Sequence, residues 1–164
     1  MVQAHNDDTL SVRPASDDDL GAVLAIERVC YPEPCIAWTE EAFRQEIEKP
    51  FSNFLVLTDD ATDTILTGYI VFWLLFDECH ILNVAVHPDW RGLGIATRLV
   101  RHAVAAAVKK DMKRVFLEVR KTNTPAVELY QRLGFFVDHV KPTFYENGDD
   151  AYFMVLYLNK SNVF

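Results

Sequence analysis

A short glycine loop at residues 91–96 is the first place where residue types and spacing could do chemistry. It reads Arg-Gly-Leu-Gly-Ile-Ala, between an apolar run, Ile81–Val86, and a segment of helical periodicity. A strand, a glycine loop and a helix bring free backbone N–H groups and the positive end of a helix dipole to one point, which suits a phosphate-bearing ligand. A tight turn that needs glycine only for steric reasons would look the same. The spacing alone leaves both interpretations open.

The loop does not match the two common nucleotide-binding patterns. No Gly-Lys-Ser or Gly-Lys-Thr follows it, so it is not a P-loop. The dinucleotide pattern G-x-G-x-x-G fails at Thr97, and we expect the preceding strands to form hairpins rather than βαβ units.

Two side chains downstream could move protons. Glu118 interrupts the apolar run Val-Phe-Leu-Glu-Val, where it is a candidate general base. A glutamate on a polar strand face, paired with Arg120, would give the same pattern. Tyr130 lies on a short predicted helix, where its phenol could protonate a leaving group or simply pack as an aromatic ring. From spacing alone, these alternatives also stay open.

Periodicity and turn residues predict the elements that must position these groups. Strands are expected at Leu10–Pro14, Phe54–Leu57, Ile65–Phe76, Glu78–Val86, Arg114–Arg120, Phe135–Val140 and Ala151–Leu158, with a turn at Asp59–Asp63. Helices are expected at Asp17–Cys30, between Thr39 and Pro50, at Leu93–Lys110 and at Asn123–Leu133. The order β-α-α-β-β-β-α-β-α-β-β indicates a mixed α/β (α+β) fold with a mostly antiparallel, twisted sheet flanked by helices. We expect one domain over residues 1–164, with a core at about 10–158 and short tails.

Composition excludes several classes of protein. The chain has 164 residues and a net charge of −8, which argues against broad nucleic-acid binding. It has no apolar run long enough to span a membrane, and the segment M-V-Q-A-H-N-D-D-T lacks the basic and apolar parts of a signal peptide. We therefore expect a cytoplasmic protein without membrane contact.

The metal-binding and redox residues form no recognisable set. The three cysteines, Cys30, Cys35 and Cys79, have no paired spacing, so we expect small buried thiols rather than disulfides or a zinc site. His80 and His87 have no companion at metal-ligand spacing and are interpreted as ordinary polar residues. No metal is predicted.

The residues around the glycine loop resemble a known family. V-x-P-x-x-R-G-x-G-I-A-x-x-L, from Val86 to Leu99, resembles motif A of the GNAT family of N-acetyltransferases, whose Gln/Arg-x-x-Gly-x-Gly/Ala signature is matched by Arg91, Gly94 and Ala96. The segments L-E-V-R, A-V-E-L-Y and L-G-F further on are similar to the RimI-type ribosomal-protein alanine N-acetyltransferases. The tail F-Y-E-N-G-D-D-A-Y-F-M is similar to N-terminal acetyltransferases. The resemblance spans about residues 10–158 and is most specific over 81–154.

The resemblance implies acetyl-CoA as co-substrate and no metal. The backbone of the strand before the loop would pair with the pantetheine arm, and the loop amides would hold the pyrophosphate. A larger side chain at Gly94 should then clash with the phosphates. The implied contacts are Val84, Ala85, Val86, Arg91, Gly92, Leu93, Gly94, Ile95, Ala96, Thr97 and Asn123. Asn123 would also suit the N-cap of the helix that follows it.

The resemblance also assigns the chemistry. It implies that Glu118 accepts the proton of the amine and that Tyr130 protonates the departing thiolate. The implied reaction is direct transfer of an acetyl group, in a ternary complex, to the N-terminal α-amine of a protein, with a ribosomal protein as the first candidate. One alternative is a lysine or small-molecule amine acetyltransferase on the same fold. The other is a non-catalytic module that binds acetyl-CoA.

Acceptor recognition is the least determined part of the sequence. Tyr31 and Tyr145 fall in the two loops that wall the peptide groove in N-terminal acetyltransferases. The first loop, Y-P-E-P-C-I-A-W, is longer than the Phe-Pro-x-Pro-Trp form common in RimI-type proteins, so it leaves the acceptor open. Acidic residues in both loops either attract a basic peptide or form a solvated face. They are Glu33, Glu146, Asp149 and Asp150.

Overall fold

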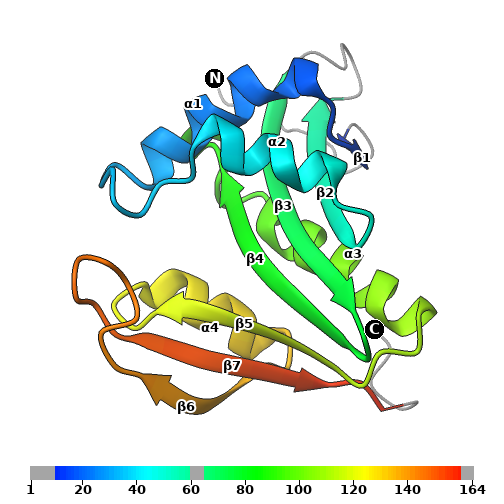
Figure 1. Cartoon of the computed structure of the whole chain (residues 1–164), viewed down its shortest axis with the longest axis vertical. Coiled ribbons are helices and arrows are strands. Elements are labelled where there is room, and N and C mark those ends of the chain that lie inside the picture. The colour runs from blue at the N-terminus through cyan, green and yellow to red at the C-terminus, as the bar shows by residue number, and fades with distance from the viewer. Residues whose placement is uncertain (1–9, 60–64, 160–164) are drawn as a thin grey trace.

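A seven-stranded twisted sheet with helices on both faces forms the body of the molecule (Figure 1). The computed structural model describes residues 10–59 and 65–159. The elements are β1 (Leu10–Pro14), the 3-10 turn η2 (Asp17–Asp19), α1 (Leu20–Cys30), α2 (Glu40–Glu48), β2 (Ser52–Asp59), β3 (Leu66–Leu75), β4 (Glu78–Val86), the 3-10 turn η3 (Pro88–Trp90), α3 (Ile95–Lys109), β5 (Arg114–Arg120), α4 (Thr124–Arg132), β6 (Phe136–Lys141) and β7 (Ala151–Tyr157). The predicted fold class and element order are confirmed. The predicted turn at 59–63 and both tails lie largely outside the described residues.

Polar side chains begin η2, which leads into α1, and begin α2; α1 itself starts at Leu20 rather than at the predicted Asp17. The Ser16 N–H donates to the Asp19 carboxylate at 2.8 Å, and Arg13 donates to both oxygens of that carboxylate. The Asp19 N–H donates to the Ser16 carbonyl, an i→i+3 bond, so this segment is a 3-10 turn that precedes α1 rather than its first turn. Thr39 caps α2, because its hydroxyl accepts from the Ala42 N–H at 3.2 Å.

The start of α3 differs from the prediction. The helix begins at Ile95 and not at Leu93, because Gly92 and Gly94 have φ angles of 78° and 75°. This left-handed conformation cannot continue into a right-handed helix. The glycine loop is therefore a separate backbone feature in front of the first helical turn.

The strands run in the order β1-β2-β3-β4-β5-β7-β6, and β4 and β5 are the parallel neighbours in the described sheet. The strands before the loop, β2, β3 and β4, pair antiparallel as expected. The helix α3 connects β4 to β5, so the glycine loop also lies in a β-α-β unit, and the expectation that no such unit is present is wrong. The two strands pair only over Glu78–Ile81 and Arg114–Leu117. Leu82 is an extra residue in the register with β3, a β-bulge, and beyond it β4 turns away from β5 (Figure 1).

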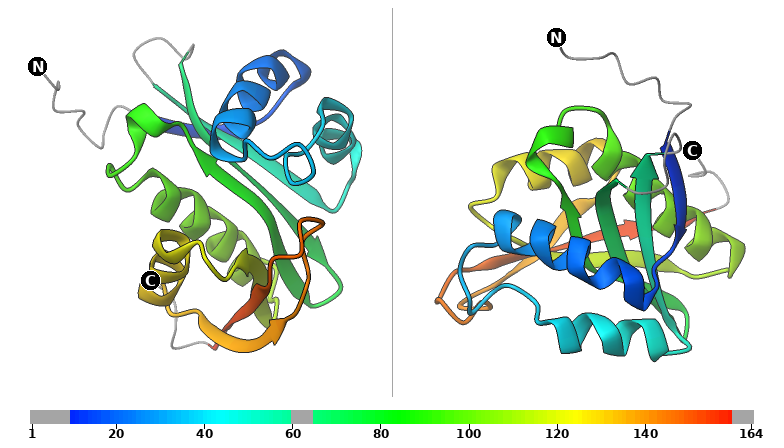
Figure 2. Two further views of the ribbon diagram at one scale, coloured as in Figure 1. Left: turned by 90° about the vertical axis from the view of Figure 1, so that its left-hand side faces the viewer. Right: turned by 90° about the horizontal axis from the view of Figure 1, so that it is seen from above.

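Two cores fix this geometry, one on each face of the sheet (Figure 2). The predicted apolar stripe of α3 packs against one face, where Ile95, Leu99, Val100, Ala103, Val104 and Ala107 are buried and Val108 is half-buried. Gly68 of β3 allows this close approach, since a Cβ there would lie 3.2 Å from Cγ2 of Ile95 and 3.4 Å from Cδ1 of Leu99. On the other face α1 and α2 pack around Phe43 and Tyr69. No described helix is long and apolar enough to cross a membrane.

Candidate active site

A cavity of about 910 Å³ opens where β4 and β5 separate. Its lining comes from β4 and β5, the end of α1 with the loop after it, the glycine loop with the first turn of α3, the start of α4, and Tyr145 between β6 and β7. The cavity therefore joins the two regions that the sequence singles out, the glycine loop and the Glu118–Tyr130 segment. Its volume is that of a small-molecule site.

The separated edge of β4 offers backbone groups to this cavity. The His87 N–H pairs with the Thr67 carbonyl of β3, and pairing alternates along an antiparallel strand. Val84 and Val86 therefore direct their N–H and C=O groups away from β3, whereas Ala85 directs its groups toward β3, so the expectation that the Ala85 backbone pairs with the ligand is wrong. The Tyr31 hydroxyl donates to the Val84 carbonyl at 2.9 Å. The pairing of β4 with β5 ends at Ile81 and Leu117. An extended ligand laid against β4 beyond that point would therefore meet N–H and C=O groups of β4 that pair with no strand.

The glycine loop and the first turn of α3 line the neighbouring part of the cavity. Gly92 and Gly94 lie here, and a Cβ built on either would have no described atom within 4 Å. The N–H groups at the start of α3 have no partner within the helix, so an anion bound here would find both donors and the positive helix end. Arg91 also lines the cavity, with Nε 3.3 Å from the Val86 carbonyl and Nη2 3.2 Å from the Cys30 thiol.

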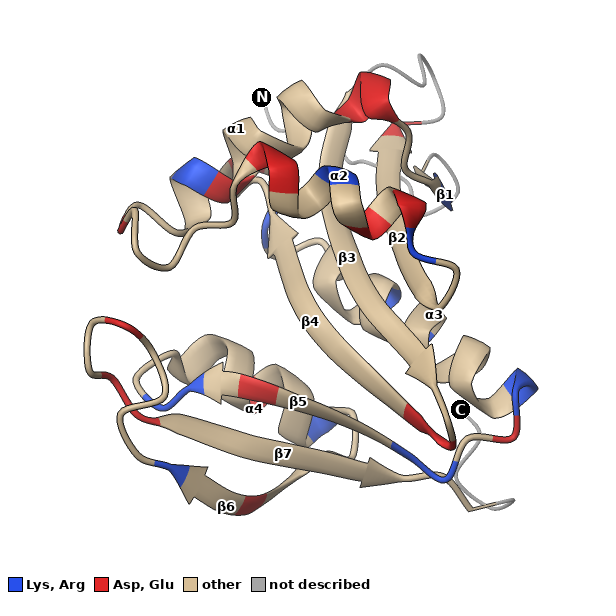
Figure 3. Ribbon diagram, viewed as in Figure 1, with Lys and Arg blue, Asp and Glu red and all other residues tan. Residues whose placement is uncertain are grey.

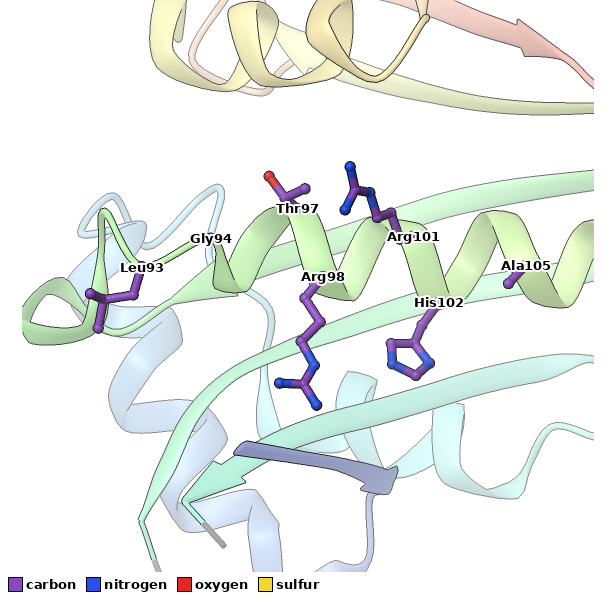
Figure 4. A pocket seen from close by; sticks show the side chains of 7 residues that line it. All are labelled: Leu93, Gly94, Thr97, Arg98, Arg101, His102 and Ala105. Carbon is purple, nitrogen blue, oxygen red and sulfur yellow. The ribbon is translucent and has the colours of Figure 1, made fainter. Parts of the chain in front are cut away.

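Leu93 is the predicted cofactor residue that the structure separates from the main cavity. It lines a shallow depression along α3 with Thr97, Arg98 and His102 (Figure 4). Arg98 points from there toward β1, where it donates to the Leu10 carbonyl. Leu93 is 40% exposed and is absent from the lining of the main cavity, although its neighbours Gly94 and Thr97 line both.

Glu118 lies on β5 just beyond the paired segment, held by two side chains. His80 Nε2 lies 2.7 Å from Oε2, and Lys141 Nζ donates to Oε1 at 2.8 Å. Burial acts to raise the pKa of Glu118, but the hydrogen bonds from His80 and Lys141 outweigh it and hold the pKa below its usual range. The side chain, 12% exposed, is thus an ionised carboxylate at neutral pH. The alternative in which Glu118 pairs with Arg120 is not observed, because Arg120 bonds to Glu33 and Asp149.

Tyr130 and Asn123 reach the same cavity from α4. Tyr130 is 9% exposed and its ring packs edge-on against Phe135, so the packing role that its helix position suggests is real and coexists with a place on the cavity wall. Burial raises the pKa of Tyr130, which keeps its phenol protonated at neutral pH. Asn123 is the N-cap of α4 and accepts from the Ala126 N–H at 3.4 Å.

The two loops expected to recognise the acceptor, residues 31–38 and 143–150, touch one another across the mouth of the cavity and are called the acceptor loops below. Arg120 lies 3.5 Å from Glu33 of the first loop and 3.3 Å from Asp149 of the second. Asn147 donates to Glu33 at 2.9 Å. The Arg120 guanidinium also lies over the ring of Tyr145, 5.3 Å from its centroid, and burial raises the pKa of Tyr145 to about 12. Glu33 and Asp149 are thus bonded within the protein rather than simply solvated.

Three residues at or next to the site are not among the site residues that the sequence predicts. His80 is not the ordinary polar residue expected, because it contacts Glu118. Lys141 reaches Glu118 from β6, across β7. Glu27 of α1 is buried and accepts hydrogen bonds from Tyr69, Asn83 and the Trp38 N–H, which ties α1 to β3, β4 and the first loop. A charged residue at a core position of a predicted helix is the signal that could have revealed Glu27.

The cysteines follow the prediction only in part. Cys79 is buried, and burial raises the pKa of its thiol to about 12, so it stays protonated. Cys30 is half-buried beside Arg91, and Cys35 is exposed in the first loop, so neither is the buried thiol expected. Cys30 lies at the end of α1, and Cys35 lies in the loop that follows, where two prolines flank Glu33 and the chain runs along the surface.

Known proteins are similar to this chain in sequence and in fold. The family model described as acetyltransferase (GNAT) family matches residues 20–135. A Bacillus subtilis protein, provisionally named ribosomal protein bS18-alanine N-acetyltransferase, is 34% identical over 152 residues, which cover 92% of this chain and 97% of that protein. The Escherichia coli K12 ribosomal protein bS18-alanine N-acetyltransferase is 29% identical over 141 residues, with coverage of 84% and 90%.

A solved structure has the same fold over nearly its whole length. The crystal structure of Ard1 from Thermoplasma volcanium superposes with a TM-score of 0.82 at 24% identity, and the match covers 93% of this chain and 99% of that one. Together with a family match over more than half of the sequence, these findings show that the chain belongs to the GNAT family of acetyltransferases.

Proposed function

We propose that this enzyme transfers the acetyl group of acetyl-CoA to the N-terminal α-amine of a protein, and that a ribosomal protein is the acceptor. The observation that carries the proposal is one cavity lined by the glycine loop, the open edge of β4, and the two proton-handling side chains Glu118 and Tyr130. Relatives named as ribosomal-protein alanine N-acetyltransferases, matched over most of their length, support this acceptor. A cytoplasmic location and a single domain over 1–164 belong to the same proposal.

The lining of the cavity between β4 and β5 suits acetyl-CoA. The N–H and C=O groups of Val84 and Val86 would pair with the amides of the pantetheine arm, as an added strand pairs with a sheet edge. The amides from Gly92 to Thr97 would hold the pyrophosphate, with Arg91 and Asn123 beside them. Ala85, Ile95 and Ala96 would contribute apolar contact, whereas the side chain of Leu93 would not take part.

The proposed reaction needs one proton acceptor and one proton donor. The acceptor nitrogen attacks the thioester carbonyl carbon, a C–N bond forms and the C–S bond breaks. Glu118 takes the proton that the nitrogen loses, directly or through water, and its bond to His80 fixes the carboxylate orientation. A backbone N–H of β4 polarises the carbonyl oxygen. Tyr130 gives its proton to the departing thiolate.

The charge state of Glu118 favours an α-amine over a lysine as acceptor. A carboxylate held below its usual pKa is a weak base. An N-terminal amine has a pKa of ~8, so about one in ten is neutral at pH 7, whereas a lysine at ~10.4 is neutral in only a few of ten thousand. A weak base is therefore sufficient for an α-amine, a larger fraction of which is already neutral, but not for a lysine. Tyr31 and Tyr145 would wall the path of the acceptor peptide.

The test is a library of peptides with free N-termini, incubated with the enzyme and acetyl-CoA and analysed by mass spectrometry for the nitrogen that gains the acetyl group. We expect acetylation of the α-amine, with preference among N-terminal sequences. Acetylation of internal lysines in N-terminally blocked peptides would instead support the lysine alternative. Tight acetyl-CoA binding without transfer to any peptide would support a non-catalytic module.

The assigned roles predict the effect of two substitutions. Glu118→Gln and Tyr130→Phe should each lower kcat by about 10²-fold or more, because each removes one proton-transfer group. The affinity for acetyl-CoA should change little. Matched controls are Glu128→Gln, an exposed glutamate on α4, and Tyr152→Phe on β7, which lies outside the cavity lining. Wild-type turnover in both active-site variants would contradict the assignment.

A further inference from the structure

Lys141 is a charged residue at the site for which the proposed chemistry has no direct use. It lies at the end of β6, two strands away from Glu118, and its side chain crosses β7 to reach it. Its Nζ lies 2.8 Å from Glu118 Oε1 and above two aromatic rings, 4.7 Å from the centroid of Phe153 and 5.3 Å from that of Phe144. An ammonium group placed over ring faces and against a carboxylate is held in position rather than free in solvent.

The two oxygens of Glu118 are thus assigned to different partners. Lys141 takes Oε1, and His80 takes Oε2. Among the described residues, the charged and titratable groups that act on the carboxylate are these two. Tyr145 of the β6–β7 loop is affected in turn, since Glu118 helps to raise the pKa of its phenol. Arg120, on the same strand, is bonded to Glu33 and Asp149 instead. Lys141 is therefore the lysine cation paired with Glu118, whereas His80 adds a positive charge only when its imidazole is protonated.

This compensation matters because the acceptor amine is mostly an ammonium ion at neutral pH. An uncompensated, poorly hydrated carboxylate would attract that ion and form a salt bridge with it. The bound amine would then keep its proton and could not attack the thioester. When the carboxylate is already paired with Lys141, the two charges nearly cancel. The site then does not bind the ammonium form of the acceptor more tightly than its neutral, reactive form.

We propose that Lys141 is a positioning residue that occupies Glu118 and so prevents the enzyme from trapping its acceptor in the unreactive ammonium form. This inference rests on the proposed function, since it concerns the same acceptor amine. It assigns to β6 a role in the acyl-transfer step that the cavity lining does not show, because Lys141 acts through Glu118 and does not itself line the cavity.

The test compares Lys141→Met with the wild type through the pH dependence of kcat and of KM for an N-terminal peptide. Removal of a cation next to a carboxylate favours a second cation there, so the acid limb of kcat should move upward by about one pH unit. At pH 7 we expect kcat to fall about tenfold and KM for the peptide to fall as well. Near pH 9.5 the two enzymes should have equal kcat. A merely structural role would lower kcat at every pH.

Two further variants serve as controls. Lys141→Arg keeps the cation and should restore the wild-type profile. Lys121→Met removes a lysine that lies over the ring of Tyr152, 5.9 Å from its centroid, without touching Glu118, and should leave the profile unchanged. A Lys141→Met profile that overlays that of the wild type, or a shift of equal size in Lys121→Met, would overturn the proposal.

A measurement without substrate keeps this inference separate from the proposed function. The titration of Glu118, followed by NMR of its carboxyl carbon in the free enzyme, should move upward by about one pH unit in Lys141→Met. An unchanged midpoint would refute the role of Lys141 even if the peptide assay works. A wild-type enzyme that acetylates no α-amine would refute the proposed function, and the NMR titration would still decide whether Lys141 compensates Glu118.

Discussion

Gly94 and Gly148 have the same left-handed backbone conformation in two different settings, with φ angles of 75° and 89°. In both cases a Cβ would meet no described atom within 4 Å. Gly94 precedes the first turn of α3 on the cavity wall, whereas Gly148 lies in the β6–β7 loop. Substitution of each glycine by alanine therefore distinguishes two effects: both variants lose stability from the backbone conformation, and only the Gly94 variant can also lose affinity for a bound ligand.

We predict that Gly94→Ala and Gly148→Ala each lower the free energy of unfolding by about 1–2 kcal/mol, the usual cost of an L side chain in this conformation. Only Gly94→Ala should also weaken acetyl-CoA binding, by about tenfold or more, because its methyl group would occupy the space proposed for the phosphates. Thermal denaturation and calorimetric titration with acetyl-CoA check the two effects. Equal acetyl-CoA affinity in both variants would contradict the phosphate site.

At this scale the sequence predicts residues whose role is local and misses those whose role depends on a partner strand. The caps at Ser16, Thr39 and Asn123 follow from side chains that reach backbone only a few residues away. The contact of His80 with Glu118 depends on β4 and β5 being parallel neighbours in a particular register. Nothing in either segment alone encodes that pairing.

Arg120 connects two elements that are far apart in the chain. Its guanidinium joins Glu33 of the α1–α2 loop to Asp149 of the β6–β7 loop and covers the ring of Tyr145. Arg114, at the other end of β5, makes one comparable ion pair, with Glu78 of β4. The two arginines are therefore a matched pair on one strand, of which only Arg120 lies at the mouth of the cavity.

We predict that Arg120→Gln loosens both acceptor loops. Amide hydrogen exchange over residues 31–38 and 143–150 should become about three- to tenfold faster, since the ion pairs lost are partly exposed and contribute about 0.2–1 kcal/mol each. KM for the acceptor peptide should rise while acetyl-CoA affinity stays constant. Arg114→Gln should leave exchange in both loops unchanged. Equal acceleration in the two variants would show that Arg120 has no special role in holding the loops.

The sequence also predicts elements better than the connections between them. The strands β2, β3 and β4 form an antiparallel meander, and β6 and β7 form an antiparallel pair. The cavity arises where α3 links the parallel strands β4 and β5, and a bulge at Leu82 precedes the point where β4 turns away from β5. The apolar run Ile81–Val86 predicts a strand and carries no mark of the bulge. The family resemblance alone indicated that the edge of this strand pairs with the pantetheine arm, and the structure supplies the physical cause, since β4 turns away from β5 after the bulge.

Charge is distributed unevenly over the whole molecule. Acidic residues gather along α2 and in the β6–β7 loop (Figure 3), and the β6–β7 loop contributes Tyr145 to the cavity lining. They add to a net charge of −8. Glu33 and Asp149 are internally bonded, but their field still reaches an approaching peptide. A basic acceptor would be drawn toward the mouth, and acetyl-CoA, an anion, would not.

We therefore predict that salt weakens the use of basic acceptors specifically. The Debye length falls from about 30 Å at 0.01 M to about 8 Å at 0.15 M, which screens the acidic face at the distance where a peptide first approaches. With acetyl-CoA saturating, KM for a peptide with arginine or lysine after its first few residues should rise several-fold over this range. KM for a neutral peptide with the same first residue should stay constant, because its contacts lie within the cavity and are little screened. If both peptides respond equally to salt, the acidic face does not guide the acceptor, and recognition rests on the loop contacts alone.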